Sequence, residues 1–236
     1  MKKIFAVVLA ALLLAAAFSA VAEDAVMTYA DFAAAEADEP VAVEAYVQKT
    51  AYNQAYGNVS VFLADNDGAY YVYRAVCDDA LAAQLVPGVK VLAKGYKAEW
   101  SGEPEIADAV LTVEEGSYIA EPKDITAELA SDTLAEKVNQ LVAVNGAAVA
   151  AYNDKGDAFS YAWDGSGQAG ANSDLYFTVT VDGANYTFTV ESDECPEGSD
   201  VYTAVTGLKV GDVIDLTGFL YWYEGAQLHV QTVTVK

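Results

Sequence analysis

The chain has 236 residues, of which 35 are acidic and 12 are basic, so its formal net charge is −23 at pH 7. Nucleic-acid-binding proteins usually carry clustered basic residues, whereas the lysines and arginines here are scattered singly. The composition therefore disfavours nucleic acid as a partner, and the acidity is expected to keep the protein soluble.

Residues 1–22 are predicted to be a secretory signal peptide. Lys2 and Lys3 precede an apolar run from Ile4 to Ala20, and Ala20-Val21-Ala22 supplies the small residues that signal peptidase requires. The alternative is an uncleaved membrane anchor, for which the apolar run is slightly short. We therefore expect the mature chain to be secreted or periplasmic, with no membrane span.

In the first half of the mature chain, Thr28 and Asp31 form a capping-box pattern that predicts a helix start. The β-branched and aromatic segments that follow predict strands, and an Ala/Leu-rich segment predicts a short helix. The expected elements are strands at 41–47, 59–64 and 70–76, a loop at 48–58, a helix at 77–85, and strands at 89–100 and 105–113. Asp65-Asn66-Asp67-Gly68 and Ser101-Gly102 are typical of hairpin turns.

The second half follows a linker around Glu121-Pro122-Lys123 and has the same order of elements. Thr133 and Glu136 form a capping-box pattern before a helix at 134–138. The further expected elements are strands at 141–151, 175–181, 185–190, 213–222 and 227–235, a polar loop at 152–173 and a helix at 195–208.

Three glycines at seven-residue spacing occur in each half, and the second set is displaced by 123 positions. These glycines are Gly88, Gly95, Gly102, Gly211, Gly218 and Gly225. Trp100 aligns with Tyr223 in the same register. This self-similarity indicates one fold written twice, and we expect a first domain over residues 23–121 and a second over residues 122–236.

Each half resembles the OB-fold, a five-stranded, partly open Greek-key barrel. The resemblance is carried by the element order and by two segments, Val86–Tyr96 and Leu208–Phe219, which look like the helix exit and fourth strand of many OB-folds. The expected fold class is all-β with short helices: two consecutive OB-fold-like barrels, each with a helix between strands three and four. A β-sandwich is the alternative. The chain resembles small exported bacterial proteins with tandem OB-fold-like domains.

No catalytic constellation stands out, so we expect the protein not to be an enzyme. The single histidine, His229, lies in the last strand with no nucleophile or carboxylate at a recognisable spacing, and we interpret it as structural. No cofactor is expected apart from calcium. Candidate calcium ligands are the acids of the long polar loop and its end: Asp154, Asp157, Asp164 and Asp174.

The two cysteines, Cys77 and Cys195, each follow the third strand of their own repeat. Export permits a disulfide, but a bridge requires Cα atoms within about 7 Å. The sequence leaves open both an intrachain disulfide and two buried free thiols.

Aromatic residues are the most suggestive candidates for ligand binding. The OB-fold resemblance implies a ligand face on strands two and three, flanked by the loops after strands one and four. The aromatic residues in those regions and at hairpin tips are Tyr52, Tyr56, Tyr71, Tyr73, Trp100, Tyr161, Trp163, Tyr176, Tyr221, Trp222 and Tyr223. Their rings suit sugars, peptides or stacked bases, although packing within the barrels or between them is the alternative. Trp100, Trp222 and Tyr223 are expected to be exposed because hairpin tips are rarely buried.

The predicted function is a secreted, non-enzymatic binding module. It would hold an extended ligand, a glycan or a peptide, on the aromatic barrel faces and hairpin tips. One alternative is the binding of single-stranded oligonucleotides, in which bases stack on the same rings. The other alternative is a structural or regulatory protein of the cell envelope.

Overall fold

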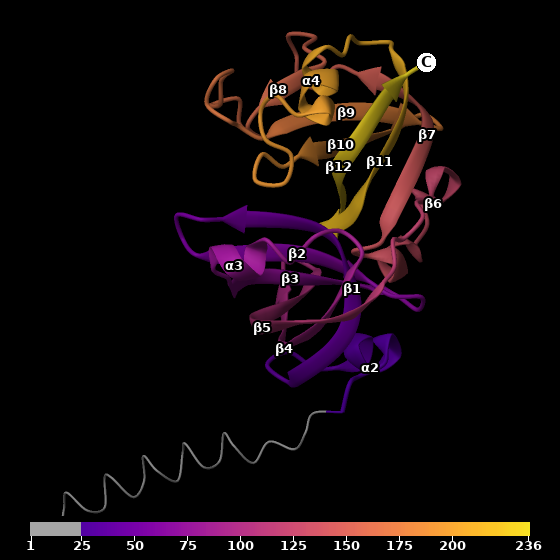
Figure 1. Cartoon of the computed structure of the whole chain (residues 1–236). Coiled ribbons are helices and arrows are strands. Elements are labelled where there is room, and N and C mark those ends of the chain that lie inside the picture. Colours follow the sequence, from indigo (N-terminus) through magenta and orange to yellow (C-terminus); the bar gives the residue numbers. More distant parts are fainter. Residues whose placement is uncertain (1–24) are drawn as a thin grey trace, which may run out of the picture.

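The computed structural model describes residues 25–236, and the predicted signal peptide lies outside the described residues (Figure 1). Two barrels follow one another along this part of the chain, the first in indigo and magenta and the second in orange and yellow. Within residues 25–236, no helix combines the length and the apolar character needed to span a membrane.

The first barrel is a closed sheet of five strands. Its elements are α2 (Tyr29–Ala34), β1 (Pro40–Asn53), β2 (Asn58–Ala64), β3 (Ala69–Val76), α3 (Asp79–Ala82), β4 (Val89–Trp100) and β5 (Glu103–Ser117). The strand order is β1-β2-β3-β5-β4, and β1 also pairs with β4 to close the ring. Strands β3 and β5 are parallel, whereas the other neighbours are antiparallel.

The second barrel repeats this topology. Its elements are β6 (Lys123–Asp124), η1 (Thr126–Glu128), η2 (Leu134–Lys137), β7 (Leu141–Ala150), β8 (Phe159–Tyr161), β9 (Leu175–Val181), β10 (Ala184–Val190), α4 (Asp200–Thr206), β11 (Val213–Trp222) and β12 (Ala226–Val235). The pairing of β7 with β9 closes the ring β7-β11-β12-β10-β9, to which β6 and β8 add outer strands. Strands β10 and β12 are parallel, as β3 and β5 are. The predicted fold class is confirmed.

The glycine repeat has a physical basis in both barrels. A Cβ at Gly95 would lie 2.5 Å from the carbonyl oxygen of Ala107, and one at Gly218 would lie 2.6 Å from that of His229. Both glycines sit where the register shifts in the pairing of the last two strands, β4 with β5 and β11 with β12. Only glycine allows the two backbones to approach so closely at these bulges.

Several predicted boundaries are wrong. Strand β1 continues to Asn53, past a bulge between Val47 and Lys49, so part of the expected loop at 48–58 is strand. The expected loop at 152–173 contains β8. The helices α3 and α4 are shorter than predicted: Asp78 and Ser199 cap their starts, later than expected, and the helices end at Ala82 and Thr206.

The two capping-box predictions have opposite outcomes. The Thr28 box is confirmed, since its hydroxyl accepts a hydrogen bond from the Asp31 N–H at 3.2 Å. The Thr133 box is wrong. Thr133 has φ −90° and ψ 1° instead of an extended backbone, makes no capping hydrogen bond, and precedes a short 3₁₀ helix.

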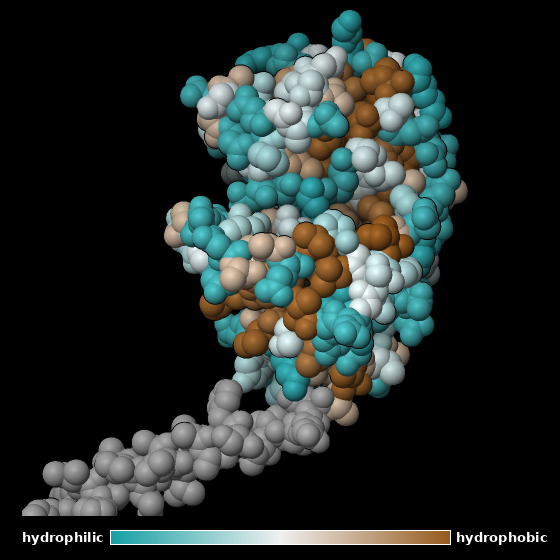
Figure 2. Space-filling view, in the orientation of Figure 1, coloured by the Kyte–Doolittle hydropathy of each residue, from teal (hydrophilic) through white to brown (hydrophobic). Residues whose placement is uncertain are grey.

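Each barrel encloses its own core, and a third, small cluster joins them. Phe62 of β2, Tyr71 of β3 and Phe219 of β11 form this cluster. The rings of Phe62 and Phe219 are stacked, with centroids 4.3 Å apart and planes 8° apart. Hydrophilic side chains gather at the junction of the barrels on the face shown in Figure 2. The barrels are therefore held together by an apolar contact beside a polar surface.

Candidate functional site

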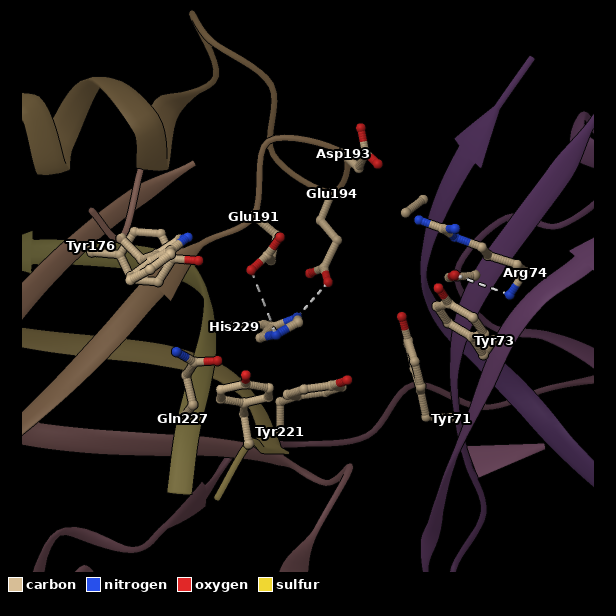
Figure 3. Close-up of a pocket in the computed structure, with 14 residues that line it drawn as sticks. Tyr71, Tyr73, Arg74, Tyr176, Glu191, Asp193, Glu194, Tyr221, Gln227 and His229 are labelled. Atoms are coloured by element: carbon tan, nitrogen blue, oxygen red, sulfur yellow. Dashed lines mark hydrogen bonds and ion pairs between the residues drawn. The ribbon is translucent and has the colours of Figure 1, made fainter. Parts of the chain in front are cut away.

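A cavity of about 500 Å³ lies between the two barrels (Figure 3). We call it the inter-barrel cavity. The first barrel contributes Ala51, Ser60, Tyr71, Tyr73 and Arg74. The second barrel contributes Trp163, Tyr176, Glu191, Asp193, Glu194, Tyr221, Tyr223, Gln227 and His229.

A β-bulge places three neighbouring side chains of β3 at the cavity. Side chains alternate along a regular strand, which accounts for Tyr71 and Tyr73. The register with β2 shifts between Val59 and Val61, so that Tyr73 and Arg74 together oppose Ser60. Arg74 takes a positive φ of 48°, and its N–H donates to the Ser60 hydroxyl at 3.2 Å. Its guanidinium lies 4.9 Å from the centre of the Tyr73 ring.

Aromatic rings contact one another in a row across the cavity. Tyr71 meets Tyr221 edge to face, with centroids 5.7 Å apart. Tyr221 in turn stacks on the imidazole of His229, with centroids 4.3 Å apart. Burial raises the pKa of the Tyr71 and Tyr221 phenols, so both stay neutral. The rings present apolar faces whose hydroxyls can still donate and accept hydrogen bonds.

The opposite wall is acidic. Glu191 and Glu194, from the loop between β10 and α4, both point toward His229 (Figure 3). Nδ1 of His229 is 2.6 Å from Oε1 of Glu194, and Nε2 is 4.0 Å from Oε1 of Glu191. Burial alone lowers the pKa of His229, but the two carboxylates outweigh it and the pKa is raised. Burial raises the pKa of Glu191 to about 7, against the attraction of His229.

His229 is therefore a site residue that the sequence did not reveal. Its partners lie at least 35 positions away, in a loop, so no spacing motif connects them. The alternation of side chains along a strand predicts that Gln227 and His229 share one face of β12. Nothing in the sequence predicts that the loop with Glu191 and Glu194 packs against that face.

The structure separates the eleven predicted aromatic residues into two groups. Those that line the cavity are Tyr71, Tyr73, Trp163, Tyr176, Tyr221 and Tyr223. Those that do not are Tyr52, Tyr56, Trp100, Tyr161 and Trp222.

The residues outside the cavity have other surroundings. Tyr52 donates to Asp79 at 2.7 Å, and Tyr161 packs edge to face on Phe159. Tyr56, in the loop between β1 and β2, is 81% exposed, and Trp100, at the end of β4, is 62% exposed.

The expected exposure of Trp222 is wrong. Its side chain is half-buried, and its ring lies over Gly102 of the first barrel, where an added Cβ would meet the ring at 2.6 Å. The two hairpin ends, β4–β5 and β11–β12, meet at the junction, and this meeting buries a side chain that an isolated hairpin would leave exposed.

The four candidate calcium ligands do not converge. Three of them accept hydrogen bonds from different neighbours: Asp157 from the Asn153 amide, Asp164 from the Ser166 N–H, and Asp174 from the Ser192 hydroxyl. Within residues 25–236, no group of three or more histidine, cysteine, aspartate or glutamate side chains is arranged to hold a metal ion.

Cys77 and Cys195 are both free and buried, one in each barrel. The structure thus contains no bridge between them.

No protein-family model matches the chain, and no curated protein matches it in sequence. Among solved structures, the chain is similar to the p204 HINb domain, at 14% identity and a TM-score of 0.36, with 85% of this chain and 98% of that chain covered. It is similar to the p202 HIN1 domain in complex with a 12-mer double-stranded DNA, at 14% identity and a TM-score of 0.36. The match covers 85% of this chain and 94% of that chain. It is also similar to a deletion mutant of the single-stranded DNA-binding protein from Thermus aquaticus, at 12% identity and a TM-score of 0.29. The match covers 84% of this chain and 93% of that chain.

Two of these neighbours are named as DNA-binding or were solved with DNA, and this finding runs against the charge-based prediction that disfavoured nucleic acid. The OB-fold assignment itself rests on the strand order of the two closed rings and on the parallel pairing of the third and fifth strands in each.

Proposed function

We propose that this protein is a non-enzymatic binding module whose ligand occupies the inter-barrel cavity. The observation that carries the proposal is the convergence of aromatic side chains from both barrels around one space of about 500 Å³. Ligand sites are concave, largely apolar and furnished with a few polar groups. Tyr73, Tyr176 and Tyr221 supply ring faces here, and Arg74 and Gln227 supply polar groups.

The surroundings of His229 support the proposal that the protein is not an enzyme. A general base acts on a nucleophile within hydrogen-bond reach. With Nδ1 of His229 bound to Glu194, the nitrogen left to act as a base is Nε2, which faces the carboxylate of Glu191 at 4.0 Å, and the ring face is covered by Tyr221. Ser60 is the serine that lines the cavity, and in the described part of the chain no hydrogen bond joins it to His229.

The ligand proposed first is an extended chain, a glycan or a peptide, of which a short segment enters the cavity. The ring faces of the tyrosines and of Trp163, together with the tyrosine hydroxyls, suit both a glycan and a peptide. Export, on the strength of residues 1–22, is part of this proposal, and fractionation of cells producing the tagged full chain tests it.

A second candidate function is the binding of single-stranded oligonucleotides. It is favoured by the position of Arg74 on β3, beside Tyr71 and Tyr73, because OB-folds bind oligonucleotides on strands two and three. Bases would stack on the tyrosine rings, and the guanidinium would meet a phosphate.

One experiment separates these ligands and tests the site. Fluorescently labelled protein is applied to glycan, peptide and single-stranded oligonucleotide arrays, and the best ligand is then titrated against variants. Trp163→Ala and Tyr73→Ala should each weaken binding roughly tenfold or more, since one stacked ring contributes about 1–3 kcal/mol. Trp100→Ala is the matched control, because Trp100 is exposed but lies outside the cavity. Equal affinities of Trp163→Ala and wild type would refute the proposed site.

A further inference from the structure

We propose that the inter-barrel cavity receives a lysine or arginine side chain of a peptide, whose cation lies against the carboxylate of Glu191. This inference rests on the proposed binding function and names its ligand class. The charges of the acidic wall, the aromatic faces beside it and the acidity of the whole chain support it independently.

Glu191 and Glu194 differ in how fully their charges are balanced. Both oxygens of Glu194 are engaged, one by His229 at 2.6 Å and the other by the Gln231 amide at 2.8 Å. Among the described residues, Glu191 has only the Thr189 hydroxyl at 3.4 Å and the Nε2 of His229 at 4.0 Å. The single positive charge of the His229 imidazolium is therefore shared by two carboxylates, and Asp193 adds a third carboxylate at the same cavity. An incoming cation would supply the missing charge.

Aromatic faces beside Glu191 also favour a cation. Tyr176 of β9 and Tyr221 of β11 line the cavity close enough for the charge of Glu191 to raise their pKa values. A cation over a tyrosine face is attracted by the ring quadrupole, and more strongly where water is displaced. The first barrel already contains such a contact, between Arg74 and Tyr73.

A peptide accounts for both walls of the cavity. The acidic wall of the second barrel would bind the basic side chain, while Arg74 on the opposite wall would meet a backbone carbonyl or a carboxylate of the same ligand. The net charge of −23 would attract a basic segment over a distance and accelerate its association. A neutral glycan would leave the charge of Glu191 unbalanced.

The test uses an array of random hexapeptides blocked at both ends, probed with wild type, Glu191→Gln and Asp154→Asn. Asp154 is the matched control, because it is an exposed carboxylate of the second barrel outside the cavity. Peptides retained by wild type should be enriched in lysine and arginine. In titration, Glu191→Gln should bind the best peptide roughly tenfold more weakly, the range expected for a hydrogen bond to a charged group. Asp154→Asn should bind it as wild type does.

A matching change in the peptide completes a double-mutant cycle with Glu191→Gln. Replacing the lysine or arginine of the peptide with glutamine should weaken its binding to wild type by the same factor as Glu191→Gln does. The same replacement should hardly change the affinity of the peptide for Glu191→Gln. Asp193→Asn, an exposed position, gives a second variant with an intermediate loss expected.

Proton release offers a readout that a purely structural role of Glu191 would not give. The groups that face Glu191 are His229 from β12, Tyr176 and Tyr221 from β9 and β11, and the acids Asp174 and Glu194. A cation beside Glu191 favours its ionised form and disfavours protonated His229, so binding near pH 7 should release protons. Calorimetry in buffers of different ionisation enthalpy measures this release, which should fall in Glu191→Gln.

The outcomes separate the inference from the proposed function. If uncharged peptides, glycans or oligonucleotides bind, lose affinity in Trp163→Ala and keep it in Glu191→Gln, the basic-peptide inference fails and the binding function stands. If no array retains the protein, both fail.

Discussion

Glu103 of β5 accepts a hydrogen bond from the backbone N–H of Trp222 in β11, at 2.8 Å, and so ties the first barrel to the second. Its side chain is fully buried, and burial raises its pKa to about 8, although the Trp222 N–H and the Asn139 amide act in the opposite direction. Its other oxygen, Oε1, is buried without a hydrogen-bond partner in the described structure. A protonated carboxyl fits this position, because one oxygen accepts and the other can carry the proton.

The junction should lose stability as the pH rises. The ordinary pKa of a glutamate is near 4.5, so between about pH 4.5 and pH 8 the folded chain holds a proton at Glu103 that the unfolded chain has lost. The stabilisation is complete below this window and disappears as the pH rises through about 8. We expect the free energy of unfolding to fall by about 2 kcal/mol between about pH 6 and pH 8, as measured by urea denaturation.

Glu103→Gln isolates this contribution from other titrating groups, Glu191 included. Glutamine keeps an acceptor for the Trp222 N–H and has no charge to bury, so the variant should be more stable than wild type at about pH 8, by about 1–2 kcal/mol. The difference should shrink at about pH 5. A difference that is the same at both pH values would contradict the buried proton.

The stacked pair Phe62 and Phe219 should show energetic coupling across the junction. Stacked aromatic pairs contribute about 1 kcal/mol beyond the area that they bury. A double-mutant cycle with Phe62→Leu and Phe219→Leu, measured by urea denaturation, should therefore give a coupling of about that size. A cycle pairing Phe62→Leu with Phe188→Leu, which lies in the core of the second barrel, should be additive within about 0.5 kcal/mol. Additivity in both cycles would show that the stacking contributes nothing.

Alanine at Gly95 or Gly218 should destabilise its barrel. The new Cβ would lie within 2.6 Å of a carbonyl oxygen on the neighbouring strand, so the bulge must widen, at a cost of about 1–3 kcal/mol. Gly207→Ala is the control, because its nearest neighbours are at 3.4 Å and its φ is −90°. Thermal unfolding of the three variants checks this. If Gly95→Ala and Gly207→Ala unfold at the same temperature, close packing is not the reason for the repeated glycine.

The two thiols should be unreactive in the folded protein. Cys77 and Cys195 are 2% and 4% exposed, and burial raises the pKa of both, so little thiolate is present or accessible. Titration with a thiol reagent such as Ellman's reagent should therefore detect both thiols only after denaturation. Rapid reaction of one thiol in the native state would contradict its burial, and Cys77→Ser and Cys195→Ser would identify which one reacts.

The sequence predicted the local structure well wherever a short segment carries its own signal. The strands at 89–100, 175–181 and 213–222 were predicted with the bounds that they have, because turns rich in glycine, asparagine or aspartate mark their ends. Predictions failed where a neighbour decides the conformation. The end of β1 pairs with β2 through residues 49–53, and this pairing extends a strand whose own sequence resembles a loop.

By itself, the sequence determined that one five-stranded fold occurs twice, because the glycines at turns and bulges must recur wherever the same backbone recurs. It also supplied the aromatic residues of the candidate site. Only the tertiary structure decided which of them face one another, since the junction half-buries Trp222 and brings Glu194 to His229 across 35 positions. The physical reason is that hydrogen bonds along a strand are local in the chain, whereas the burial and charge of a site depend on surfaces that meet only after both barrels have formed.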